Sequence, residues 1–103
     1  MNFDMNKMLR EAQRMQEELA KVQEEAASEV VEASAGGGMV TVKANGAGEV
    51  VSITIDPKAI DPDDPEFLED AVLAAVNEAL RAAQALAESK LGGSLGGLGL
   101  PGL

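Results

Sequence analysis

The sequence predicts an α+β fold with the element order α-β-β-β-α. Three observations lead to this prediction. An N-terminal segment without glycine or proline repeats apolar residues at helical spacing, two short alternating runs are joined by a loop that contains Asn-Gly, and an Asp-Pro-Glu sequence opens a second apolar segment. The alternating runs, with a shorter β-branched run before them, predict a three-stranded antiparallel sheet that the second helix can cover.

The first element is a long helix predicted over 4–27. Apolar residues recur there at alternating steps of three and four, which is the spacing of a heptad seam. At ~1.5 Å per residue the helix is roughly 36 Å long. The apolar seam of this helix is narrow and suits packing against one or two other helices. The seam consists of Met5, Met8, Ala12, Met15, Leu19, Val22 and Ala26.

Three strands follow, predicted near 29–33, 39–44 and 49–56. In the second strand the alternation places Val40, Val42 and Ala44 on one face. In the third it places Val51, Ile53 and Ile55 on one face, opposed to Val50, Ser52 and Thr54. The loop between these two strands predicts a β-hairpin.

The glycines around these strands raise the question of a phosphate-binding loop. Such a loop leads into a helix N-terminus, whereas Gly36-Gly37-Gly38 leads into a strand and no Gly-Lys-Ser/Thr follows. The pair Gly46 and Gly48 lacks the third glycine of G-x-G-x-x-G, because Val51 stands there. The glycines are therefore interpreted as turn residues.

The second helix is predicted to begin at Pro65, with Asp64 as its N-cap, and to end near Lys90 before Gly92-Gly93. It is richer in Ala, Leu and Val than the first helix and should be more deeply buried. We expect one domain over 1–91 and a flexible Gly/Leu-rich tail over 92–103.

Composition excludes several classes of function. The chain of 103 residues has no cysteine, histidine, tryptophan or tyrosine, which removes disulfides, thiolate chemistry and the commonest general base and zinc ligand. The acidic loop of Asp56, Asp61, Asp63 and Asp64 lacks calcium-ligand spacing and is interrupted by prolines. We therefore expect no enzyme activity, metal, cofactor or small-molecule substrate. Neither a signal peptide nor a membrane span is apparent, which predicts a cytoplasmic protein.

The exposed seam of the first helix predicts a homodimer, because a methionine-rich stripe of that length is an aggregation hazard unless a second copy covers it. The candidate interface residues are Met5, Met8, Met15, Leu19, Val22, Val51 and Ile53.

Four of the eight basic residues lie on the first helix, although the formal net charge is −10. Lys7, Arg14 and Lys21 are seven residues apart and form a column, with Arg10 beside it. Two interpretations remain open: the column binds a polyanion, or it forms a solvated ladder of i,i+4 ion pairs with Glu11, Glu18 and Glu25. Arg81 and Lys90 of the second helix extend the basic set.

The segments "MLREAQRMQEELAKVQEE", "AGGGMVTVKANGAGEVVSITIDP" and "LEDAVLAAVNEALRAAQ" resemble the YbaB/EbfC family of bacterial nucleoid-associated proteins. The resemblance covers nearly the whole chain. It implies an αβββα homodimer with projecting helices that binds DNA, alters its conformation and contributes to nucleoid organisation and gene expression. Since the family's DNA contacts are attributed to its two helices, the matching cations here are Lys7, Arg10, Arg14, Lys21, Arg81 and Lys90.

The sequence therefore predicts a homodimer that contacts the phosphates of duplex DNA with little sequence selectivity, in the cytoplasm and nucleoid. The alternative is an acidic protein-interaction module that docks partners through its Met-rich seam and its tail.

Overall fold

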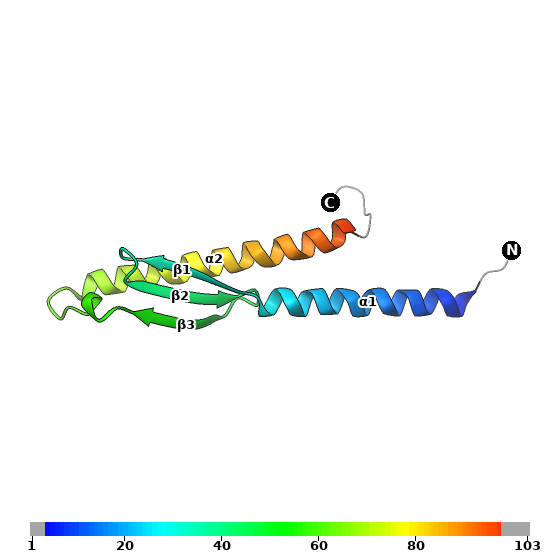
Figure 1. Cartoon of the computed structure of the whole chain (residues 1–103), viewed down its shortest axis with the longest axis horizontal. Coiled ribbons are helices and arrows are strands. Elements are labelled where there is room, and N and C mark those ends of the chain that lie inside the picture. The colour runs from blue at the N-terminus through cyan, green and yellow to red at the C-terminus, as the bar shows by residue number, and fades with distance from the viewer. Residues whose placement is uncertain (1–3, 98–103) are drawn as a thin grey trace.

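A computed structural model of the chain describes the backbone of residues 4–97 and the side chains of residues 4–93. The molecule is elongated (Figure 1). Its extents along the three principal axes are 80 × 24 × 14 Å. Its elements are α1 (Met5–Ser28), β1 (Val30–Ala35), β2 (Val40–Asn45), β3 (Val50–Ile55), the short 3-10 helix η1 (Pro57–Ala59) and α2 (Pro65–Gly97). The predicted order α-β-β-β-α is confirmed.

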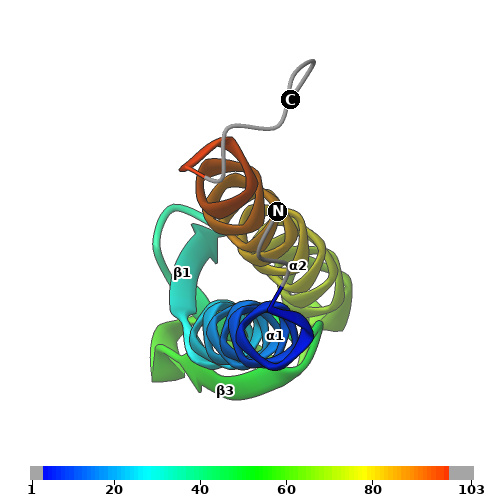
Figure 2. The same cartoon turned by 90° about the vertical axis from the view of Figure 1, so that its right-hand side faces the viewer.

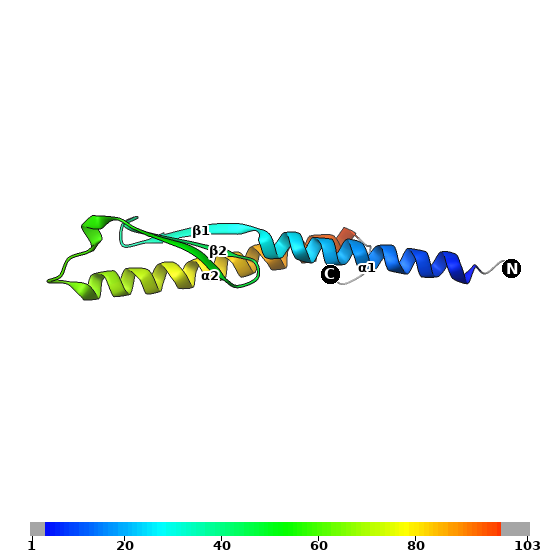
Figure 3. The same ribbon diagram turned by 90° about the horizontal axis from the view of Figure 1, so that it is seen from below.

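Helix α1 projects from the body of the molecule along its long axis (Figures 1 and 3). Asp4 caps its first turn, because the carboxylate accepts a hydrogen bond of 3.1 Å from the Lys7 backbone N–H. Met5, Met8 and Met15 are exposed, with 60, 52 and 48% of their surface accessible. Leu19 and Val22 are half-buried and Ala26 is buried, so the seam is covered only near the base of α1.

The base of α1 is held against the hairpin by a close backbone approach. The Gly46 N–H donates a hydrogen bond of 3.1 Å to the Glu29 carbonyl oxygen. A Cβ atom at Gly46 would lie 1.9 Å from the Ala26 carbonyl oxygen, so no other residue fits there without movement of the backbone. Gly46 thus joins the turn after β2 to the last turn of α1.

The three strands form an antiparallel sheet in the order β1-β2-β3. Ser34 and Thr41 face each other across the first pair, with their hydroxyl oxygens 3.0 Å apart. The second pair is irregular between Lys43 and Ala44, where two steps along β3 match one step along β2. Val50, rather than Val51, therefore lies opposite Ala44, and the simple alternation predicted for β3 is wrong at this end of the strand.

Helix α2 packs on one face of the sheet, mainly over β1 and β2 (Figure 3). The core beneath it is thin: Val40 and Val42 are its largest fully buried side chains, and α2 contributes the row Ala71, Ala75, Ala79 and Ala83. The predicted inward face of β2 is confirmed. Strand β3 has little cover from α2, and Val51 and Ile53 remain 49 and 46% exposed.

The predicted end of the second helix near Lys90 is wrong, because α2 continues through Gly92 and Gly93 to Gly97. Neither glycine has a positive φ, so neither forms the left-handed cap that ends a helix. Residues 98–103 of the predicted tail lie outside the described residues, and the division into 1–91 and 92–103 stays a prediction. Within residues 4–97, no helix combines the length and the apolar character that crossing a membrane requires.

Candidate nucleic-acid interface

Three of the predicted DNA-contacting cations lie at the free end of α1. Lys7, Arg10 and Arg14 are exposed and line a shallow hollow of about 260 Å³, together with Glu11. Viewed along the long axis, α1 points toward the viewer and away from the body (Figure 2). This position holds the three cations clear of the sheet and open to a large ligand.

The i,i+4 ladder predicted as one alternative for α1 is not formed. Among residues 4–93, whose side chains are described, two ion pairs fall within 4.0 Å: Arg81–Glu78, with Nη2 and Oε2 2.8 Å apart, and Lys90–Glu29. Within the same residues, Lys7, Arg10, Arg14 and Lys21 therefore have no carboxylate partner at that range. Their charges remain available to an external anion.

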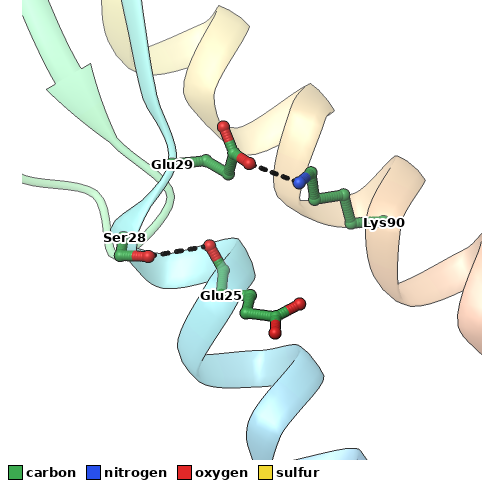
Figure 4. Close-up of polar contacts among 4 residues, drawn as sticks. All are labelled: Glu25, Ser28, Glu29 and Lys90. Atoms are coloured by element: carbon green, nitrogen blue, oxygen red, sulfur yellow. Dashed lines mark hydrogen bonds and ion pairs between the residues drawn. The ribbon is translucent and has the colours of Figure 1, made fainter.

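The two cations of α2 are placed differently. Arg81 pairs with Glu78 one turn earlier on its own helix. Lys90 forms an ion pair with Glu29, the C-cap residue that follows α1, as Figure 4 shows. In the same view the Ser28 hydroxyl donates a hydrogen bond of 3.0 Å to the Glu25 carbonyl oxygen. Arg81 and Lys90 thus already have anionic partners within the chain.

The charge of α1 divides between its two halves. From Met5 to Gln16 the helix carries three cations and one carboxylate. From Glu17 to Ser28 it carries four carboxylates and only Lys21 as a cation. A phosphate backbone is attracted to the first half and repelled by the second, because like charges within about 10 Å of each other still interact at moderate salt. The seven-residue spacing predicted that Lys7, Arg14 and Lys21 form a single column. The carboxylates around Lys21 separate it from the other two cations.

Within the described part of the chain, no group of three or more carboxylates lies close enough together to hold a metal ion. Phe67 is the aromatic residue whose side chain is described, and it lies on α2, not on α1. The free half of α1 therefore offers cationic contacts and, within the described residues, no ring for base stacking or wedging.

Comparison with known proteins decides the family. The sequence profile of the YbaB/EbfC DNA-binding family matches residues 1–98. The chain belongs to this family. The YbaB/EbfC chain is 54% identical over 101 residues to a nucleoid-associated protein of Thermoanaerobacter pseudethanolicus, an alignment that covers 98% of this chain and 91% of that protein. It is 48% identical over 103 residues to a nucleoid-associated protein of Pelotomaculum thermopropionicum, which covers 100 and 98% of the two chains.

A solved structure shares the fold of this YbaB/EbfC chain. The crystal structure of the uncharacterized protein HP0035 from Helicobacter pylori superimposes with a TM-score of 0.71, covering 91% of this chain and 99% of that one. The two sequences are 24% identical, so the likeness concerns the arrangement of helices and strands.

Sequence reasoning missed two residues that shape this interface. Glu29 forms an ion pair with Lys90, which lies 61 positions further along the chain, and no sequence pattern indicates that pair. Gly46 fixes the base of α1, and the only signal was its place in an Asn-Gly turn. The division of charge along α1, by contrast, was visible as a run of glutamates around Lys21.

Proposed function

We propose that this protein is a nucleoid-associated DNA-binding protein that acts as a homodimer and changes the conformation of the DNA it binds. The observation that carries the proposal is the cluster of Lys7, Arg10 and Arg14, exposed and unpaired by any carboxylate of residues 4–93. Membership of the YbaB/EbfC DNA-binding family and the nucleoid-associated relatives support it. We place the protein in the cytoplasm, on the nucleoid.

The exposed apolar surface supports the proposal of a second copy. One chain has a radius of gyration of 20.7 Å, whereas a compact chain of this length has about 13 Å. Met5, Met8 and Met15 on α1 and Val51 and Ile53 on β3 are all exposed in the single chain. A homodimer would cover these side chains and would display two basic helix ends together.

The contacts with DNA are made to phosphates. Lysine and arginine on an exposed helix end bind phosphate oxygens without reading base sequence. Of the six candidate cations, Lys7, Arg10 and Arg14 make the main contacts in this proposal. Lys21 lies among glutamates, and Arg81 and Lys90 would first have to leave Glu78 and Glu29.

The salt dependence of duplex binding tests this assignment. A variant with Lys7, Arg10 and Arg14 all changed to Gln is compared with one in which Lys21, Lys43 and Lys58 are changed to Gln, since both lose three positive charges. The slope of log K against log salt should fall by about 0.9 for each phosphate that the first variant no longer neutralises. It should change little in the second. Equal reductions in both variants would mean that overall charge, and not the end of α1, governs binding.

A further inference from the structure

Figure 1 shows the turn that joins β1 to β2 beside the first part of α2, at the end of the molecule away from the free end of α1. A second hollow is lined by residues of this turn and of α2. Its volume is about 260 Å³. The residues that line it are Ala35, Gly36, Phe67, Asp70, Ala71 and Ala74. None of these belongs to the proposed dimer surface or to the basic end of α1.

The lining of this hollow matches the chemistry of a long cationic side chain. Alanine methyl groups and the side chain of Phe67, a residue that is 41% exposed, can cover the methylene stem of an arginine. The Asp70 carboxylate can accept hydrogen bonds from a guanidinium, and the Phe67 ring offers a face for cation–π contact. We propose that this hollow binds an arginine side chain presented by a basic segment of a partner protein.

Gly36 brings the β1–β2 turn close to α2 at one side of the hollow. A Cβ atom at Gly36 would lie 3.1 Å from the Ala71 Cβ and 3.3 Å from the Phe67 Cζ. Gly36 also has a φ of +65°, a conformation in which other residues are strained. Glycine at this position therefore allows the turn to lie close against α2, where a Cβ atom would be crowded.

The negative charge around the hollow favours a positively charged partner. Residues 56–70 contain seven carboxylates and one cation, Lys58. Asp56, Asp61 and Asp64 accept hydrogen bonds from the backbone N–H groups of Lys58, Asp63 and Phe67, which accounts for three of the seven. The field of this end repels a phosphate backbone and attracts a positively charged polypeptide. A basic protein segment is thus the complementary ligand, and its binding is independent of the proposed DNA contacts.

Nuclear magnetic resonance on the isotopically labelled full-length chain tests the proposal. The probe is the acetylated, amidated peptide GRGRG, and its control is the same peptide with citrulline in place of arginine, which keeps the shape and removes the charge. The arginine peptide should shift the amide signals of Gly36, Phe67, Asp70 and Ala74 more than those of the glutamate-rich half of α1. Equal binding of the two peptides, or equal shifts along α1, would overturn the proposal.

Matched variants locate the contact. Asp70→Asn should weaken binding of the arginine peptide at least about threefold. Glu69→Gln removes the same charge from the same helix outside the hollow and should leave binding nearly unchanged. Phe67→Leu keeps an apolar side chain there and should also weaken binding, which keeps the proposal testable if Asp70→Asn alters the fold. If Asp70→Asn abolishes salt-sensitive self-association in sedimentation without affecting the peptide, the occupant is a second copy and the proposal is wrong.

Discussion

The side chain of Lys90, near the end of α2, forms an ion pair with Glu29, the C-cap residue that follows α1, across 61 positions of sequence. The two side chains are 38 and 41% exposed, so solvent screens their attraction. We expect Lys90→Gln to lower the free energy of unfolding by about 0.5 kcal/mol. Urea denaturation of Lys90→Gln, Glu29→Gln and the double variant measures the coupling. If the two single effects simply add, the pair contributes nothing of its own.

The approach of Gly46 to α1 gives a sharper prediction. Gly46→Ala places a Cβ atom against the Ala26 carbonyl and should destabilise the fold by about 2–4 kcal/mol, since relief requires backbone movement. The matched control is Gly92→Ala, where a Cβ atom meets nothing within 4 Å. This change should stabilise the fold, by up to about 1 kcal/mol, because alanine favours the helix. Thermal unfolding of both variants measures this difference in stability. The prediction is wrong if Gly46→Ala does not destabilise the fold.

The alanine row of α2 should resist enlargement. Ala79 is fully buried, and Ala79→Leu should destabilise the chain by about 1–3 kcal/mol through overpacking against the sheet. Ala85 on the same helix is exposed, so Ala85→Leu should have little effect. Chemical denaturation of the two variants measures the difference. Equal stabilities would mean that α2 does not pack on the sheet through this row.

We expect charged substitutions in the seam of α1 to dissociate the proposed dimer. The native protein should have a mass of twice the 10.6 kDa of one chain in light scattering. Replacing Met8 and Met15 with Glu introduces charge into the seam and should shift the mass toward that of the monomer. Leu9 is also exposed but lies off the seam, so Leu9→Glu should leave the dimer intact. A native protein that is already monomeric at micromolar concentration contradicts the proposed seam.

Much of the fold was predictable because local patterns and packing agree. The first helix, predicted over 4–27, spans Met5–Ser28, and the alternation of β2 matches its buried face. The end of α2 was not predictable from Gly92 and Gly93. A glycine in a helix interior costs only about 1 kcal/mol, and it ends a helix when it adopts a left-handed conformation, which neither residue does.

The candidate site was only partly predictable. The spacing of Lys7 and Arg14 follows directly from the sequence, and so does the position of Arg10 beside them. The pairing of Lys90 depends on how far α2 extends past the base of α1, which is a tertiary property. The irregularity in β3 similarly depends on pairing with β2, since a run of alternating residues contains no sign of the extra step.

The alanine row of α2 has a consequence for how this protein tolerates mutation. Ala71, Ala75, Ala79 and Ala83 have no side-chain torsions, so none of them can turn aside to make room for a larger neighbour. A change of size at one of these positions must instead be absorbed by displacement of the whole helix. Random substitution should therefore be tolerated least along this line, although three of its four residues lie outside both proposed binding surfaces.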